Sequence, residues 1–282
     1  MTPGLDQLSH LQRELLDEWL PGAEFEKNHS WGLVGTMVLE LSHDGGRYVV
    51  KAGHAKDHHL AREIHAHRHW LTPWISIGRA PRLVRADEGA KLLVTRYLPG
   101  GLVQDSDYEQ EPDIYRQAGE LLARFHVQLT VEDAEFETRE KAKTLQWLDK
   151  PHRIEPRLAE RLGDLVQSWP TPQSILVPTH GDWQPRNWIL HDGLVSVIDF
   201  GRADLRPALT DFGRLAVQQF AKNPATEAAF LDGYGDDPRD RAAWQRNRIR
   251  EAIGTAVWAY QVGDERFEHQ GHRMIAAALA DT

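Results

Sequence analysis

The hydrophobic pattern of this chain changes once, near residue 99, and that change constrains the fold more than any other feature. Before it, short apolar stretches alternate with turn residues, as in antiparallel strands. After it, apolar residues recur mainly at helical spacing. Pro99, Gly100 and Gly101 mark the boundary, because proline and paired glycines interrupt both kinds of element. The pattern predicts an α+β chain with a sheet-rich first part and a helix-rich second part.

The spacing of apolar residues and turn signals locates the elements of the first part. We expect helices over 5–20 and 57–70. The residues His43–Gly46 form a hairpin turn. The predicted strands cover 36–41, 47–52, 81–86 and 91–97.

Helical periodicity dominates the second part of the chain, in four segments: 108–128, 152–168, 210–221 and 239–279. We therefore divide the chain into a small N-terminal antiparallel sheet lobe over 1–98 and a larger, mainly helical C-terminal lobe over 99–282. The segment that joins them, about 94–101, is a natural hinge, and a ligand cleft between two such lobes is a common arrangement.

The candidate catalytic and metal-binding residues concentrate between residues 180 and 201. Asp182 is followed five residues later by Asn187, and Asp199 comes directly after the apolar run 194–198. Phosphoryl transfer from a magnesium nucleotide needs a carboxylate that accepts the proton of a hydroxyl, and oxygen ligands for Mg²⁺. Asp-x-x-x-x-Asn alone is a weak signal. Joined to a strand that ends in Asp-Phe-Gly, it is a strong one.

Two residues of the first part fit the same chemistry. Lys51 ends a predicted strand, and a lysine that faces a cleft from such a strand can pair with nucleotide phosphates. Glu63 lies on the next predicted helix and can hold Lys51 through an ion pair. Taken singly, each is as compatible with a solvated surface residue. Their order relative to the Asp/Asn/Asp set favours the functional interpretation.

Together these residues resemble the aminoglycoside phosphotransferase family, small-molecule kinases with a protein-kinase-like fold, over most of the chain. The residues that carry the resemblance are His180-Gly181-Asp182, Asn187, Ile198-Asp199-Phe200-Gly201, Val50-Lys51, Glu63 and the segment 92–100.

The resemblance implies a role for each matching position. Lys51 would contact the α- and β-phosphates, and Glu63 would orient it. Backbone groups near Thr95 and Tyr97 would bind the adenine edge. Asp182 would be the catalytic base. The metal ligands would be Asn187 and Asp199. The implied cofactors are ATP, with GTP as an alternative, and Mg²⁺.

Asp-Phe-Gly occurs a second time, at 211–213, and the two copies must be distinguished. The first copy follows a β-branched strand, whereas the second begins a predicted helix with Thr210 as its N-cap. We therefore assign the metal to Asp199. Asp211 resembles the family's structural aspartate and receives no catalytic role.

Several features favour a small-molecule substrate over a protein substrate. Gly181 stands where protein kinases place an arginine, and the gap between Asp199 and Asp211 is too short for a long activation segment. The loop before the first strand departs from the G-x-G-x-x-G pattern, with Gly32 and Gly35 alone. Gln184 occupies a position where protein kinases commonly have lysine. Arg186 is not expected to substitute, because its direction along the loop differs.

The charge of the chain bears on the substrate class. The net charge is −9, and residues 101–282 account for it, with 21 Lys+Arg against 30 Asp+Glu. An acidic half disfavours nucleic acid and can attract a cationic small molecule, although a solvated acidic surface is equally compatible. The candidate substrate residues are Trp183, Asp204, Glu251, Asp264, Glu265 and Glu268.

Six histidines between residues 54 and 69 make a second cluster. A zinc site needs three or four convergent ligands, and the chain has no cysteine, so most of these histidines are expected at the surface. No apolar run approaches the roughly 20 residues of a membrane helix, and the N-terminus lacks a signal-peptide pattern. We expect a cytoplasmic protein, monomer or homodimer, that acts on a small molecule.

Three functions remain open on the sequence. The first is a kinase that phosphorylates a hydroxyl of a cationic antibiotic, an aminoglycoside or a tuberactinomycin-type peptide, and so confers resistance. The second is a primary-metabolite kinase for an amino alcohol, sugar or amino sugar. The third is a nucleotide-binding pseudokinase scaffold, which the intact Lys/Glu/Asp/Asn/Asp set disfavours, because a scaffold has no need of the base.

Overall fold

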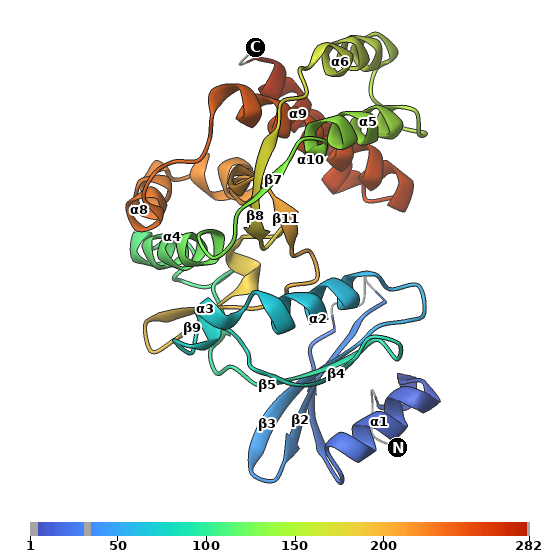
Figure 1. Cartoon of the computed structure of the whole chain (residues 1–282), viewed down its shortest axis with the longest axis vertical. Coiled ribbons are helices and arrows are strands. Elements are labelled where there is room, and N and C mark those ends of the chain that lie inside the picture. The colour runs from blue at the N-terminus through green and yellow to red at the C-terminus, as the bar shows by residue number, and fades with distance from the viewer. Residues whose placement is uncertain (1–4, 31–34, 281–282) are drawn as a thin grey trace. The chain divides into compact units, whose positions relative to one another are not determined.

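The computed structural model describes residues 5–30 and 35–280 (Figure 1). The chain forms two compact units. The first comprises Met1–Gln128, His180–Asp204 and Ala225–Gly235, and the second comprises Leu129–Thr179, Leu205–Pro224 and Asp236–Thr282. This partition differs from the division at residue 98, which stays a prediction.

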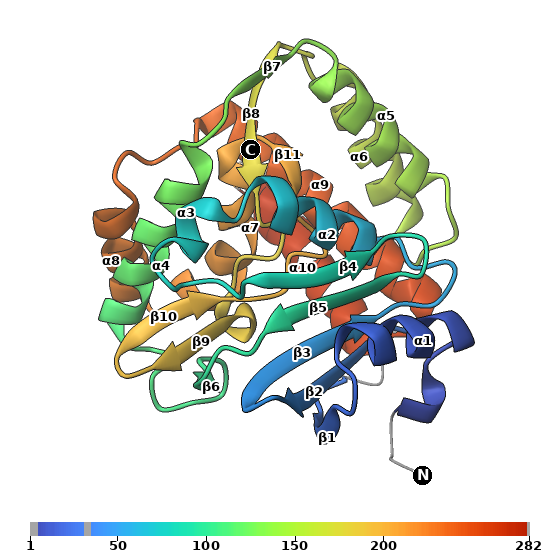
Figure 2. The ribbon, with the colours of Figure 1, turned by 60° about the horizontal axis from the view of Figure 1, so that its bottom comes forward.

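An antiparallel sheet of five strands, in the order β1-β2-β3-β5-β4, organises the first unit. Figure 2 shows β2, β3, β5 and β4 side by side. The four predicted strands are confirmed to within about two residues at each end. An additional edge strand, β1, is mostly exposed and polar, so it has no apolar alternation by which sequence could reveal it. The strands are β1 Glu24–Asn28, β2 Met37–His43, β3 Gly46–Ala52, β4 Leu83–Asp87 and β5 Leu92–Arg96.

Helices cover both faces of this sheet. In β5, alternate side chains point to opposite faces: Leu92 and Val94 pack in one core cluster with Leu16 of α1 (His10–Trp19). Leu93 packs instead with Ile64 of α2 (His59–His69). The two predicted helices of the first part are therefore present, and β5 is buried on both faces between them. This explains why β5 lacks the polar alternation of a half-exposed strand.

The first unit also contains a three-stranded antiparallel sheet, β10-β9-β6, and helices that pack beside it. Gly119 of α4 would place a Cβ 2.1 Å from a backbone oxygen of α8, and Gly233 of α8 would place one 2.0 Å from a backbone oxygen of α4. The two glycines thus let the helices approach closely (Figure 2). The elements are α3 Thr72–Ile75, β6 Gly101–Leu102, α4 Pro112–His126, β9 Trp188–His191, β10 Leu194–Val197 and α8 Pro224–Tyr234.

The second unit is mainly helical, with the short sheet β11-β8-β7. Its core gathers apolar residues from α6, α9 and α10, and the buried carboxylate of Glu137 on α5 receives the guanidinium groups of Arg246 and Arg250 from α9. Its elements are β7 Val131–Asp133, α5 Phe136–Leu148, α6 Pro156–Ser168, β8 Ser174–Thr179, β11 Asp204–Arg206, α9 Arg241–Val262 and α10 Glu265–Ala280.

The segment predicted as a helix over 210–221 is more irregular than expected. A 3-10 helix, Ala208–Phe212, is followed by one α-helical turn, Gly213–Leu215, and a π-helical turn, Ala216–Phe220. Thr210 is therefore not an N-cap: it lies inside the 3-10 turn, where its hydroxyl donates to the Pro207 carbonyl. The helix α5 and the helix α8 were not predicted, and both lie between the segments of clearest periodicity. Among the described helices, none is long and apolar enough to cross a bilayer.

Candidate active site

A β-hairpin places Asn187 and Asp199 close together. In the antiparallel pair β9–β10, Trp188 faces Val197, so the next residues outward are Asn187 and Ile198, and the Ile198 N–H donates to the Asn187 carbonyl at 3.0 Å. The turn at the other end is Asp192-Gly193, both with positive φ (48° and 74°), as a two-residue type I′ turn requires. This Asp-Gly signal was readable in the sequence. Sequence reasoning assigned the second strand but missed the hairpin.

The loop that carries Asp182 is braced from within. The His180 ring is fully buried, accepts the Asp182 backbone N–H at Nδ1 (3.3 Å), and donates from Nε2 to the Ile198 carbonyl (3.0 Å). Between them Gly181 has φ 76°, a conformation that favours glycine. His180 therefore ties this loop to the start of Asp199-Phe200-Gly201, which agrees with the structural role expected for it.

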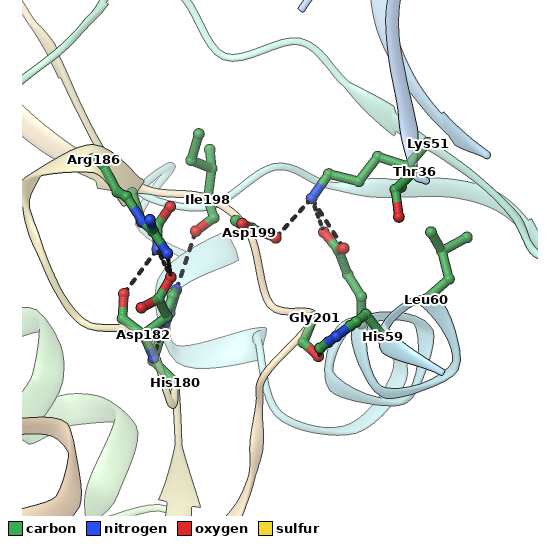
Figure 3. A network of polar contacts seen from close by, with 12 residues as sticks. Thr36, Lys51, His59, Leu60, His180, Asp182, Arg186, Ile198, Asp199 and Gly201 are labelled. Atoms are coloured by element: carbon green, nitrogen blue, oxygen red, sulfur yellow. Dashed lines mark hydrogen bonds and ion pairs between the residues drawn. The ribbon is translucent and has the colours of Figure 1, made fainter. Parts of the chain in front are cut away.

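The carboxylate of Asp182 is 96–97% buried and accepts hydrogen bonds from three side chains of its own loop. Arg186 Nη2 donates to Oδ2 at 2.6 Å (Figure 3). Gln184 Nε2 donates to Oδ1 at 2.6 Å, and Asn187 Nδ2 donates to Oδ2 at 3.0 Å. Whether Arg186 can substitute for the lysine of protein kinases stays a prediction, but its guanidinium does pair with Asp182. The turn Pro185–Asn187 is a 3-10 helix, and it turns the side chain of Arg186 back onto Asp182.

The predicted ion pair between Lys51 and Glu63 is present. Lys51 Nζ lies 2.8 Å and 2.9 Å from the two Glu63 oxygens, and 3.1 Å from Asp199 Oδ1 (Figure 3). Burial alone lowers the pKa of Lys51, but Asp199 and Glu63 outweigh it, so the pKa is raised. The Lys51 charge holds the pKa of Asp199 below its ordinary value, against its partial desolvation and the charge of Asp182.

Glu63 differs from Asp199 in the balance of these effects. Burial raises the pKa of Glu63, the charge of Asp199 acts in the same direction, and the bonds to Lys51 only partly offset them. Lys51 is thus held charged between two carboxylates, of which Asp199 is the more strongly ionised and, with a side chain about half exposed, the more accessible.

One face of α2 contacts Phe200 and Gly201 directly, and it contacts Lys51, the ion-pair partner of Asp199, through Glu63. His59 Nδ1 lies 3.0 Å from the Gly201 carbonyl, Glu63 accepts the Phe200 backbone N–H, and the His67 ring packs edge-on against the Phe200 ring at 5.3 Å. Residues 59, 63 and 67 are spaced four apart, so they share a helix face. This spacing was visible in the sequence, but the segment that the helix face contacts, Asp199-Phe200-Gly201, was not.

The expectation that most of the six histidines lie at the surface is confirmed, and His67 is the buried exception among them. Its side chain is 7% exposed because it fills the space between α2 and Phe200. Burial, and secondarily the charge of Lys51, lowers the pKa of His67 to about 3, so the ring is neutral.

The donor set at the end of the hairpin fits a magnesium ion. The amide nitrogen of Asn187 is committed to the backbone and carboxylate oxygens of Asp182 (2.8 Å and 3.0 Å), so the orientation of the amide leaves Oδ1 as its free acceptor end. Asp199 supplies an ionised carboxylate, and its backbone has a positive φ of 68°. Two hard oxygen donors suit the coordination preference of Mg²⁺.

The segment predicted as a hinge is partly engaged in the sheet. Thr95 lies on the interior strand β5, paired with both β3 and β4, and the Tyr97 N–H donates to the Arg47 carbonyl at 3.1 Å. The Tyr97 N–H is therefore engaged within the sheet, and binding of the adenine edge by backbone groups near Thr95 and Tyr97 stays a prediction. The Tyr97 ring lies against the Arg47 guanidinium, 3.9 Å from its centroid.

Gly100 is required by its position in the same segment. It has φ 122°, and a Cβ there would lie 2.4 Å from the Leu190 carbonyl oxygen. The chain thus turns tightly at Gly100 against β9, the strand that follows Asn187 in the sequence. Of the two loop glycines, Gly32 lies outside the described residues.

The candidate substrate residues do not form one group. Trp183 is 1% exposed and stacks on Trp74 (5.6 Å between ring centroids), which places it in an aromatic core and argues against the predicted substrate contact. Asp204 is partly buried at the start of β11.

The four remaining candidate acids lie in the second unit, with separate surroundings. Glu251 lines a small cavity between the 213–218 segment, α9 and α10. Asp264 accepts the Phe267 N–H at the start of α10, and Glu265 is exposed. Glu268 is 3% exposed and lies 3.5 Å from Arg153, so the expectation of a solvated or substrate-facing acid was wrong for it: its carboxylate is part of the core.

The fold and this arrangement define a class: a kinase-like phosphotransferase, with an antiparallel N-terminal sheet and a helical C-terminal region. The model of the phosphotransferase enzyme family (APH) matches residues 35–245, and the chain belongs to this family. No curated protein sequence matches the chain.

Solved structures of antibiotic phosphotransferases share the fold at low sequence identity. Aminoglycoside phosphotransferase APH(4)-Ia is 11% identical, with 96% of this chain and 98% of that chain covered and a TM-score of 0.72. Spectinomycin phosphotransferase APH(9)-Ia, solved with ADP and spectinomycin, is 12% identical over 95% and 96%, with a TM-score of 0.60. Macrolide 2′-phosphotransferase MphH from Brachybacterium faecium is 16% identical over 96% and 98%, with a TM-score of 0.58.

Proposed function

We propose that this protein is a small-molecule kinase that transfers the γ-phosphoryl group of ATP, or of GTP, to a hydroxyl of a cationic antibiotic. The observation that carries the proposal is the convergence of Asp182, Asn187 and Asp199 at one end of a hairpin, with Lys51 held against Asp199 by Glu63. That set supplies a base, two metal ligands and a phosphate-binding cation, which phosphoryl transfer requires.

In this proposal each side chain has one task. Asp182 accepts the proton of the acceptor hydroxyl and orients its oxygen. Lys51 binds the α- and β-phosphates, and Glu63 keeps it in place. Asn187 and Asp199 hold Mg²⁺, which neutralises phosphate charge when bound. Most of the rate gain comes from positioning and preorganised electrostatics, because the protein forms no covalent bond with the phosphoryl group.

The proposed substrate class rests on charge and on the structural neighbours. Residues 101–282 carry the whole net charge of −9, which favours a cationic acceptor such as an aminoglycoside or a tuberactinomycin-type peptide. A thermostable mutant of APH(4)-Ia was solved with ADP and hygromycin B, and APH(9)-Ia with ADP and spectinomycin. We propose that the protein acts in the cytoplasm, as a monomer or homodimer, and confers resistance.

The test is ATP consumption by purified protein in the presence of Mg²⁺ against a panel of aminoglycosides, tuberactinomycin peptides, choline, amino sugars and hexoses. We expect turnover on a basic antibiotic, and raised resistance in a host that expresses the gene. Asp182→Asn should abolish both. Asp192→Asn makes the same chemical change at the exposed hairpin turn, where asparagine tolerates the positive φ, and should have no effect.

Other outcomes would replace the proposal. Turnover only on choline, hexoses or amino sugars would indicate a primary-metabolite kinase. Tight nucleotide binding without turnover on any compound would indicate a pseudokinase scaffold. Wild-type turnover by the Asp182→Asn variant would show that the base is assigned to the wrong residue.

A further inference from the structure

The loop that carries Asp182 contains a cation, Arg186, that has no task in the proposed function. The guanidinium of Arg186 lies 2.6 Å from Oδ2 of Asp182, and its side chain is 34% exposed, whereas that of Asp182 is 4% exposed. The salt bridge therefore joins a buried carboxylate to an arginine that reaches toward solvent. Arginine is well suited to exchange partners in such a place, because its planar fork matches carboxylates and phosphates equally well.

The contacts of Asp182 show why this arginine matters for the reaction. Gln184, which is neutral and 4% exposed, binds the other carboxylate oxygen at 2.6 Å. Arg186 and Asn187 share Oδ2. A carboxylate that accepts this many donors is a weaker base and has fewer lone pairs for a substrate hydroxyl. Of the three donors, Arg186 alone is charged, partly exposed and on a long side chain, so it is the one that can leave.

The reaction also needs a cation at a second place. The transferred phosphoryl group spreads negative charge over three oxygens in the transition state, and a positive group aimed there accelerates the transfer. Lys51 is already held by Glu63 and Asp199, with Nζ 2.8–3.1 Å from their oxygens. Arg186 is on the loop of the base itself.

We propose that Arg186 binds the γ-phosphoryl group, exchanging its contact with Asp182 Oδ2 for phosphoryl oxygens when the nucleotide is bound. This proposal rests on the proposed kinase function and deepens it. Nucleotide binding then removes the charged donor from Oδ2 of the base, which keeps its contact with Asn187, at the moment when an acceptor hydroxyl must be deprotonated, so the two events are coupled through a single side chain.

Arg186 neither gives nor takes a proton in the transfer step. The acceptor oxygen forms a bond to the γ-phosphorus, and the bond between that phosphorus and the β–γ bridging oxygen breaks. Its electron pair leaves with ADP. The hydroxyl proton moves to Asp182, and Arg186 stays protonated throughout.

An alternative role for Arg186 is to brace Asp182, with no phosphate contact. The two roles differ in their dependence on the third phosphate. We compare the affinities of wild type, Arg186→Gln and Arg186→Lys for Mg·ADP and for the non-hydrolysable analogue Mg·AMP-PNP by isothermal titration calorimetry. Arg85→Gln, the same change at an exposed position on β4, is the matched control.

For Arg186→Gln we expect the Mg·AMP-PNP affinity to fall about tenfold or more, with the Mg·ADP affinity within about twofold of wild type. Arg186→Lys should recover part of the loss, because it restores the charge without the fork. Thermal melting of each variant shows that it is folded. Because the lysine variant preserves the cation next to Asp182, it keeps the test usable if the glutamine variant fails to fold.

Equal losses for both nucleotides, or no loss for either, would overturn the phosphate contact and leave only the brace. If wild type itself binds neither nucleotide, the kinase function fails and this inference fails with it. If wild type binds both and Arg186→Gln binds both as well as wild type, only the role of Arg186 is refuted, and the kinase function is decided separately by turnover.

Discussion

Replacement of His67 by leucine should stabilise the protein and remove part of its sensitivity to acid. The ring is 7% exposed, and within the described residues neither of its nitrogens has a hydrogen-bond partner. A buried polar group without a partner costs about 1–3 kcal/mol. Leucine has a similar size and no polar atom, so His67→Leu should raise the free energy of unfolding at pH 7.5 by about 1–2 kcal/mol.

The pH dependence gives a sharper magnitude. The pKa of His67 is lowered from its ordinary value of 6.5 to about 3, chiefly by burial. Below pH 6.5 the unfolded chain therefore binds a proton that the folded chain does not bind until about pH 3. The free energy of unfolding must therefore decrease as the pH is lowered from about 6.5 to about 3. Between pH 7.5 and pH 5.5 the loss due to this one group is about 1.4 kcal/mol.

Urea unfolding followed by tryptophan fluorescence at pH 7.5 and 5.5 measures this loss in wild type and variant. The fall in unfolding free energy should be about 1.4 kcal/mol smaller in His67→Leu. His69→Leu, at an exposed position on the same helix, should keep the wild-type pH dependence. If His67→Leu loses as much stability as wild type between the two pH values, the reasoning about a neutral buried imidazole is refuted.

Three further predictions concern the site and the fold. Glu63→Gln should lower kcat/KM for ATP about 10–100-fold, because an uncharged amide replaces the carboxylate that pairs with the Lys51 ammonium; unchanged kinetics would remove it from the site. Asp199→Asn should lower Mg²⁺-dependent turnover about a hundredfold or more, while Asp211→Asn chiefly lowers the melting temperature; the reverse pattern would exchange their roles. Gly119→Ala should destabilise by several kcal/mol, since its Cβ would lie 2.1 Å from a backbone oxygen of α8. Gly163→Ala on α6 has open space and should stabilise by about 0.5–1 kcal/mol in the same melts.

Some errors of sequence-based prediction have a common physical origin. The edge strand β1 is polar and mostly exposed, and β7 has only three residues, so neither shows a clear apolar alternation. Thr210 has the chemistry of an N-cap, but the segment already forms a 3-10 helix from Ala208, two residues earlier. In both cases contacts with the rest of the chain overrule a weak local preference.

The candidate acids illustrate the same limit for the site. Asp264 caps α10 and Glu268 is buried near Arg153, and nothing in their local sequence distinguishes them from the exposed Glu265. Charge is a property of composition, whereas the partner of a charge is a property of packing. The acidic bias of the second half was readable, but which acids remain available to a ligand was not.

The sequence by itself determined the change from a sheet-rich to a helix-rich part, four strands of the first sheet, the hairpin turn at Asp44-Gly45, and the spacing of Asp182, Asn187 and Asp199, because these depend on periodicity and turn chemistry over a few residues. Only the tertiary structure decided the contacts of Lys51 with Asp199, 148 residues apart, and the burial of His67 against Phe200. The turn of Arg186 back onto Asp182 spans four residues, yet it too depended on the fold, since the backbone of the loop is shaped by the hairpin and by His180. Long-range pairs form where packed elements bring side chains together, and no local pattern encodes that meeting.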